Sequence, residues 1–121
     1  MSKRKKKRYN CPGEMTLSLI GGKWKLVLLL NMRRGPKRFG ELRRHSPGIT
    51  PATLNLHLKE LVSAGLIKRS AMASDRLLGV EYSLTIKGQS LKPIMSALTK
   101  WGLNHQKDFV LGDFGMAEFQ K

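Results

Sequence analysis

The chain has a single cysteine, Cys11, among its 121 residues. One thiol cannot form a disulfide within the chain, which excludes a disulfide-stapled domain. No apolar run approaches the ~18 residues of a transmembrane helix. The basic N-terminus is not followed by the apolar stretch of a signal peptide. These absences predict a soluble protein of a reducing compartment, most simply the cytoplasm.

Acidic residues are also scarce: 8 Asp and Glu stand against 23 Lys and Arg, for a formal net charge of +15. The block "KRKKKR" from Lys3 to Arg8 contains only cations, so it cannot pack and is expected to be disordered. A solubilising tail and a localisation signal are alternatives, but an arm that lies on phosphates is favoured. The basic surface would also fit an RNA-binding or ribosome-associated protein. We expect an arm at residues 1–10, one domain at residues 11–104 and a C-terminal tail at residues 105–121.

The motifs of common enzymes are missing. The sequence has no glycine-rich phosphate loop, no paired carboxylates and no Cys/His spacing typical of a metal site. His45, His57 and His105 are scattered, and the first two are expected to contact phosphate or solvent rather than a metal. We therefore expect no enzymatic activity, no cofactor and no bound metal.

What the chain does contain is an ordered set of elements between residues 37 and 84. A short helix from Arg38 to His45 is followed by the turn "SPGI" and by a helix from Thr50 to Gly65. Thr50 is a helix cap and Pro51 suits the first helical position, so the second helix has a strong start. A β-hairpin from Leu66 to Leu84 follows, with a polar tip. This order predicts a mostly α fold with a small β-hairpin wing: a winged helix-turn-helix, which sets one helix into a DNA major groove.

The second helix has two distinct faces. Leu54, Leu58, Leu61 and Val62 form an apolar stripe at helical spacing, and the opposite face carries an amide, a lysine and a leucine. Such side chains can contact base edges, although a solvated face with one stray leucine is the bland alternative. For Arg76 at the tip of the wing, contact with the DNA backbone or minor groove and plain solvation are equally good interpretations. The residues expected to contact double-stranded DNA are Arg38, Arg43, Arg44, Thr50, Ala52, Thr53, Asn55, Leu56, Lys59, Lys68, Arg69 and Arg76.

Helices are also expected on both sides of this module. Glu14 to Ile20 predicts a short helix, and Lys23 to Met32 is apolar nearly all round, which predicts a buried one. After Thr85, Pro93 should kink the last helical region or divide it in two. That region carries an apolar stripe that nothing else in the chain obviously covers, so we expect it to bury against a second copy. The expected dimer residues are Leu91, Ile94, Met95, Leu98 and Trp101.

Cys11 has two interpretations. It precedes a predicted helix and follows six cations, and both features favour the reactive thiolate. Against this, most free cysteines pack as small hydrophobes, and a disordered basic arm is heavily screened by salt.

Four segments, in order, resemble the HxlR-type winged-helix regulators, relatives of the MarR group. They are "CPGEMTLSLIGGKWKLVLLLNM", "GPKRFGELRRHSPGIT", "LKELVSAGLIKR" and "VEYSLTIKGQSLKPI", and the resemblance covers roughly Cys11 to Trp101. It implies a bacterial or archaeal homodimer that binds palindromic operators through a dimer of terminal helices. It also implies that Cys11 lies where some members sense a small electrophile or oxidant. Where the family usually has tandem prolines before "VEYSLT", this chain has Leu77-Leu78-Gly79, and its basic arm is longer.

Two functions remain open on the sequence. The first is a dimeric, sequence-specific transcriptional regulator of double-stranded DNA, associated with the nucleoid. The second is a non-specific architectural protein that uses the same fold. Competitor DNA distinguishes them, because only the first keeps a preferred site in excess bulk DNA.

Overall fold

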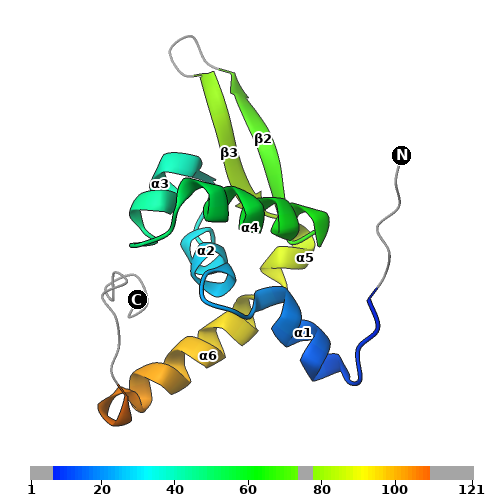
Figure 1. Ribbon diagram of the computed structural model, residues 1–121, viewed down its shortest axis with the longest axis vertical. Coiled ribbons are helices and arrows are strands. Elements are labelled where there is room, and N and C mark those ends of the chain that lie inside the picture. Colours follow the sequence, from blue (N-terminus) through cyan, green and yellow to red (C-terminus); the bar gives the residue numbers. More distant parts are fainter. Residues whose placement is uncertain (1–6, 74–77, 110–121) are drawn as a thin grey trace.

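The computed structural model describes residues 7–73 and 78–109 of the chain, and Figure 1 shows their arrangement. The described part is mostly helical with one small antiparallel sheet, as the sequence predicts. Elements follow in the order α1 (Pro12–Ile20), α2 (Lys25–Asn31), β1 (Lys37–Arg38), α3 (Phe39–Arg44), α4 (Pro51–Ser63), β2 (Ile67–Ala73), β3 (Leu78–Leu84), α5 (Ile86–Gln89), α6 (Lys92–Asn104) and the 3-10 turn η1 (Gln106–Asp108).

The wing is part of a three-stranded sheet with the order β1-β3-β2. The hairpin β2–β3 is the one the sequence predicts, and the alternation on β3 is confirmed because Tyr82 and Leu84 are buried. Strand β1 was not predicted; Lys37 pairs with Tyr82 and Arg38 with Glu81. The first helix of the motif therefore begins at Phe39 rather than at Arg38. The hairpin extends away from α6, which lies at the other end of the molecule (Figure 1).

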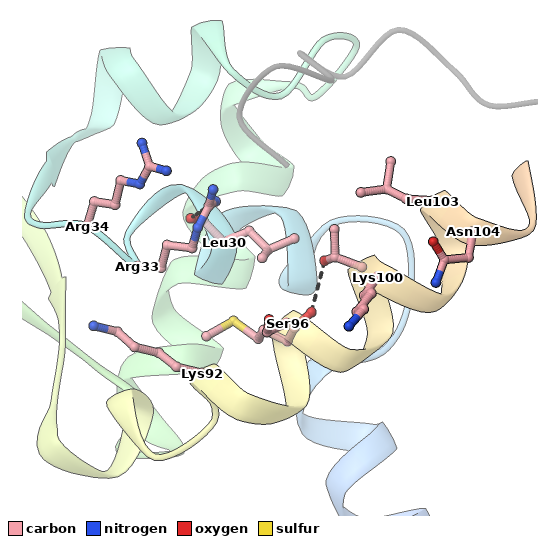
Figure 2. Close-up of a pocket in the computed structure, with 10 residues that line it drawn as sticks. Leu30, Arg33, Arg34, Lys92, Ser96, Lys100, Leu103 and Asn104 are labelled. Carbon is pink, nitrogen blue, oxygen red and sulfur yellow. Dashed lines mark hydrogen bonds between the residues drawn. The ribbon is translucent and has the colours of Figure 1, made fainter. Parts of the chain in front are cut away.

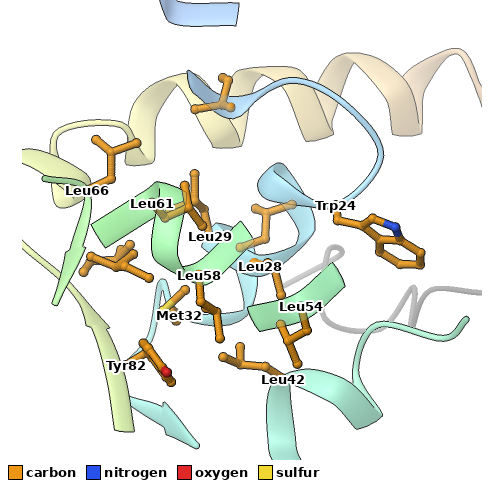
Figure 3. Packing of buried hydrophobic residues seen from close by; sticks show 14 of the residues in the cluster. Trp24, Leu28, Leu29, Met32, Leu42, Leu54, Leu58, Leu61, Leu66 and Tyr82 are labelled. Carbon is orange, nitrogen blue, oxygen red and sulfur yellow. The ribbon is translucent and has the colours of Figure 1, made fainter. Parts of the chain in front are cut away.

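The core lies where α2 packs against α4 (Figure 3). Leu28 and Leu29 on α2 are fully buried, which confirms that this apolar helix is internal, and Trp24 before it is core as well. One assignment was wrong: Val62 is 39% exposed, so it lies outside the buried stripe of α4. The remaining buried residues that bind the elements together include Leu42, Ile49, Leu54, Leu58, Leu61, Leu66, Ile67, Tyr82 and Leu84.

The turn between α3 and α4 follows the predicted local chemistry. Gly48 has a φ of +91°, a region that side chains other than glycine rarely adopt. Ile49 is buried beneath the turn. The hydroxyl of Thr50 accepts the backbone N–H of Thr53 at 3.2 Å, and Pro51 takes the first helical position. This cap fixes the start of α4 and thereby the direction in which its exposed face points.

The last helical region is divided in two, as Pro93 predicts. Helix α5 ends at Gln89, and Pro93 lies in the first turn of α6, where its missing N–H is tolerated. Gly88 on α5 packs so closely on Leu66 that a Cβ there would overlap the Leu66 carbonyl. One predicted dimer residue is corrected here: Met95 is only 1% exposed and belongs to the core of its own protomer.

Candidate nucleic-acid interface

The exposed side of α4 is the central feature of the candidate site. Leu54, Leu58 and Leu61 hold the helix on the core, so the opposite side faces solvent along its length. Leu56 is 56% exposed, which leaves a large apolar side chain mostly in water. The predicted contact residues of this helix are accessible: Ala52, Asn55, Leu56, Lys59 and, at the edge, the half-buried Thr53.

An acidic side chain, that of Glu60, borders that exposed face one turn after Leu56. Within Pro51–Ser63 the acid is Glu60, whose carboxylate lies 3.5 Å from Lys25 Nζ and 3.4 Å from His57 Nδ1. The Glu60 side chain remains 44% exposed, so it is paired at the surface rather than buried. His57 is half-buried beside Glu60 and, at helical spacing, lies well away from Asn55 and Lys59. A polyanion approaching the helix therefore meets amide, ammonium and methyl groups, and the neighbouring carboxylate is paired with Lys25.

The start of α4 adds cations and a positive helix end. Arg43 and Arg44, in the last turn of α3, are exposed. The hydroxyl of Thr50 donates a hydrogen bond to the hydroxyl of Thr53 at 2.9 Å, so both side chains already take part in the cap of α4. The unpaired N–H groups of a helix start suit a phosphate, and two arginines nearby strengthen that preference.

Arg38 is placed by a feature that sequence reasoning missed. Because β1 lies beside β3, the Arg38 guanidinium crosses Gly79, where a Cβ would stand 3.1 Å from Nη2. Gly79 thus leaves the space that Arg38 occupies. A hollow beside it is lined by Arg38, Gly40, Glu41 and Arg44. Nothing in the local sequence indicates that Gly79 and Arg38 meet, although the segment "VEYSLT" identifies strand β3.

The Glu41 carboxylate makes the stability of the folded protein depend on pH. Its carboxylate accepts the Arg38 backbone N–H at 3.0 Å, and this bond is the main cause that lowers the Glu41 pKa; partial burial opposes it, and the charges of Lys37, Arg44 and Arg38 add to it. Because the Glu41 pKa is lower in the folded state than in the unfolded state, where it is about 4.3, the ionised carboxylate stabilises the folded protein above about pH 4.3. That stabilisation is lost as the pH falls through the pKa of the folded state.

We expect the urea midpoint of the protein to fall on acidification below about pH 4.5, and Glu41→Gln to reduce the slope of that fall. The measurement is a series of urea titrations between neutral and acid pH. Asp108→Asn, which also replaces an exposed carboxylate with an amide, is the matched control. Identical profiles for the protein and Glu41→Gln would show that the carboxylate contributes nothing to the start of α3.

The wing residues divide between two faces. Lys68 pairs with Ser83 and Arg69 with Tyr82, and successive residues of a strand point to opposite faces. Both are exposed, yet a duplex on one face of the wing meets only one of them. Arg76, also predicted to contact DNA, lies outside the described residues, as do the first cations of the basic arm.

Cys11 has a definite structural place. It is the cap residue of α1, and its Sγ accepts the Glu14 backbone N–H at 3.3 Å while the side chain stays exposed. The Glu14 carboxylate in turn accepts the backbone N–H of Asn10 at 3.1 Å. Cys11 is thus neither buried nor packed, which removes the inert-hydrophobe interpretation of this thiol.

An apolar surface lies on α6, away from the wing. Ile94 is 41% exposed, Leu98 44% and Trp101 58%. The Trp101 ring stacks on His105, with ring centroids 4.1 Å apart. Of the predicted dimer residues, Leu91 is half-buried against the core and Met95 is inside it, so three remain on the surface.

Two absences concern the described part of the chain. Within residues 7–73 and 78–109, no three His, Cys, Asp or Glu side chains come together as metal ligands would. No helix there is both long and apolar enough to cross a bilayer.

A model of the HxlR-like helix-turn-helix family matches residues 19–109. The chain belongs to this family. It is 44% identical over 100 residues to YtcD, an uncharacterized HTH-type transcriptional regulator of Bacillus subtilis (strain 168), across 83% of this chain and 79% of that protein. The members are transcriptional regulators rather than enzymes, and the chain is accordingly a transcriptional regulator with a helix-turn-helix fold.

Solved structures agree. The redox regulator HypR in its reduced form superposes with a TM-score of 0.75 at 43% identity, over 79% of this chain and 94% of that one. Its oxidized form gives a TM-score of 0.73 at 44% identity, over 78% and 97% of the two chains. A regulator from Porphyromonas gingivalis W83 described as MarR family matches at 0.73 and 35% identity, over 84% and 99%. The predicted relationship to winged-helix regulators of these groups is confirmed.

Proposed function

We propose that this HxlR-family member binds a palindromic operator in double-stranded DNA as a homodimer and chooses the site through the exposed face of α4. The observation that carries the proposal is the exposed surface of Asn55, Leu56 and Lys59 on a rigidly held helix, beside which the Glu60 carboxylate is paired with Lys25. Asn can pair with adenine, Lys with guanine or phosphate, and an apolar side chain with the thymine methyl. Arg43, Arg44 and the start of α4 would hold the backbone beside them.

The homodimer would form through α6. Ile94, Leu98 and Trp101 repeat at the spacing of one helix face, and each leaves a large part of its apolar surface in water. Pairing the same face of two copies would bury both at once, as a two-fold interface requires. Such a dimer would place two α4 helices about one DNA turn, ~34 Å, apart, so that the operator mirrors the symmetry of the protein.

The test is selection of bound sequences from random duplexes in excess bulk DNA. A regulator should enrich two half-sites with inverted symmetry whose centres lie about 10 base pairs apart. A non-specific architectural protein would enrich no motif, because competitor DNA would displace it equally from every duplex.

A further part of the proposal is that Cys11 senses electrophiles or oxidants. Its support is the exposed thiol at the positive end of α1, together with similarity to a regulator solved in reduced and oxidized forms. The Sγ accepts the Glu14 backbone N–H at the start of the helix and remains open to a reagent. Because the chain has one cysteine, a disulfide would join Cys11 to a second subunit or to a small thiol.

We expect iodoacetamide to alkylate Cys11 faster than it alkylates free cysteine at neutral pH, and the adduct to change operator affinity. Cys11→Ser is the matched control, because serine keeps the cap of α1 while removing the nucleophile. The measurements are the alkylation rate by mass spectrometry and DNA affinity before and after. Alkylation no faster than free cysteine, or an adduct with unchanged affinity, would leave Cys11 as a cap only.

A further inference from the structure

A hollow of about 320 Å³ opens at the base of the wing, where the sheet meets α5 and the start of α6. We call it the wing-base hollow. It is bounded by the connection from α2 to β1, by β2 and β3, and by the corner between α5 and α6. All of the described residues that line it lie outside α4. The polar side chains among them are those of Arg33, Arg34, Lys68, Ser83, Gln89 and Lys92.

The walls of the wing-base hollow are cationic. Met32 and Leu84 line it as buried apolar residues, so the polar side chains stand on an apolar base. Lys68 and Ser83 pair in register across β2 and β3, and the side chains of such a pair share one face of the sheet. None of the described residues that line the hollow is acidic. An anion is therefore the ligand whose charge complements these walls.

Three of the four cations have no ion-pair partner in the part of the chain that the structure describes. Arg34, Lys68 and Lys92 are exposed, and no carboxylate among the described residues lies within ion-pair distance of them. Arg33 differs, because its Nη1 donates to a carbonyl of α2 at 3.0 Å. Figure 2, which is centred on a neighbouring pocket along α6, shows the Lys92 side chain extending away from Ser96. Arg34, Lys68 and Lys92 are thus available to a ligand.

One acid lies near the wing-base hollow but does not line it. Glu81 is on the same face of the sheet as Ser83, two residues earlier on β3. It pairs in register with Arg38 of β1 and Ser70 of β2. Lys92 also lies in the first turn of α6, where the helix dipole disfavours a cation and favours an anion. A concave surface with one sign of charge concentrates counter-ions, so the hollow suits a compact polyanion.

The size and position of the wing-base hollow favour a short chain of phosphate groups over a nucleic acid. Its volume of about 320 Å³ lies at the lower end of the range of about 300–1,000 Å³ for small-molecule sites, and it excludes a double helix. The hollow is at the end of the wing nearest α5, whereas the hairpin extends away from α6 (Figure 1). DNA held by the exposed face of α4 would use other residues.

We propose that the wing-base hollow binds an oligophosphate, either inorganic or as the phosphate chain of a nucleotide. Arg34 binds one phosphate group through its guanidinium fork, and Lys68 and Lys92 neutralise the others. Ser83 and Gln89 donate hydrogen bonds from their hydroxyl and amide groups. The proposal goes beyond the proposed function, because this ligand can bind whether or not the protein is a dimer on an operator.

The experiment titrates the full-length, isotope-labelled protein with inorganic tripolyphosphate and follows backbone amide signals by NMR. Salt at about 0.15 M screens weak attraction to the rest of the basic surface. We expect saturable binding with a Kd of about 0.1 mM, with shifts that cluster at Gly35, Lys68, Ser83 and Gln89. Inorganic phosphate should bind at least about tenfold more weakly, because a single group reaches fewer of the cations. Bound tripolyphosphate should also raise the temperature of thermal unfolding.

Two double variants with equal loss of charge test the assignment. Arg34→Gln combined with Lys68→Gln should weaken tripolyphosphate binding about tenfold or more. Lys100→Gln combined with Lys107→Gln changes exposed lysines that do not line the hollow, and should weaken binding less than about twofold. Ser83→Phe keeps every charge, fills the hollow and should abolish binding, and strands accept phenylalanine readily. The amide spectrum of each variant shows whether it is folded.

Replacing tripolyphosphate with ATP distinguishes the two sources of the phosphate chain. Equal or tighter binding of ATP supports a nucleotide, and binding at least about tenfold weaker supports an inorganic oligophosphate. Shifts confined to α4 and the N-terminal cations would overturn the proposal. Equal weakening by the two double variants, unchanged binding to a folded Ser83→Phe protein, or phosphate bound as tightly as tripolyphosphate would each overturn it as well.

Discussion

Replacing Leu98 with glutamate is expected to dissociate the homodimer and to weaken binding to a palindromic site by about 100-fold or more. Leu98 lies between Ile94 and Trp101 on the exposed side of α6, so a carboxylate there would be buried without a partner if two copies paired. An uncompensated charge in an interface costs about 3 kcal/mol or more, and every 1.4 kcal/mol is tenfold in affinity. Sedimentation at micromolar concentration and titration of a full palindrome measure the two effects.

The matched control is Ile86→Glu, which introduces the same charge at a residue that is 91% exposed on α5. It should leave both the dimer and the DNA affinity unchanged. Affinity for a single half-site separates the causes, because Leu98→Glu should bind a half-site as the unchanged protomer does. A Leu98→Glu protein that sediments as a dimer with full operator affinity would place the interface elsewhere.

Asn55→Ala is expected to cost about 1–3 kcal/mol of binding at a selected operator and to relax base choice at one position. Asn55 is exposed on α4 and points away from Glu60, and its amide can form two hydrogen bonds with one adenine edge. Alanine there keeps the helix and removes only the interaction with the base. The measurement compares affinity for the operator, for each single-base variant of it and for random duplex.

The contrasting variant deletes residues 3–8, the cationic block. Its effect should be equal on operator and random DNA, and the salt slope should become shallower by about 0.9 for each phosphate that the block neutralises. Ser63→Ala, on the same face one turn beyond Lys59, tests the end of α4. If Asn55→Ala weakened random and selected DNA equally, the amide would be positioning the backbone rather than choosing a base.

The helix-turn-helix could be predicted because its signals are local. Thr50 followed by Pro51 starts α4, and the Ser46-Pro47-Gly48 turn needs only a proline and one residue of positive φ. The buried side of α4 follows from leucines at helical spacing, and its exposed side follows as the remainder. The candidate DNA-binding residues of α4 were accordingly predictable as a surface, although no sequence pattern says that a duplex lies there.

The features that the sequence did not predict correctly are set by long-range packing. Strand β1 is too short to give a period, and it forms only because β3 offers a free edge. Val62 and Met95 were misassigned because helical spacing locates a stripe but not its borders, which the neighbouring elements set. The wing-base hollow was not foreseen, since its lining residues come from segments far apart in the sequence whose packing no local pattern encodes.

A photo-crosslink tests most directly whether the exposed face of α4 lies in a DNA major groove, as we propose. A photoreactive phenylalanine analogue replaces Leu56, and in a matched protein it replaces Ile86, which is exposed on α5. Each is irradiated on a selected operator, and the attached nucleotides are mapped. We expect crosslinks from position 56 to bases within each half-site and none from position 86. Crosslinks from position 86 with none from position 56 would contradict it.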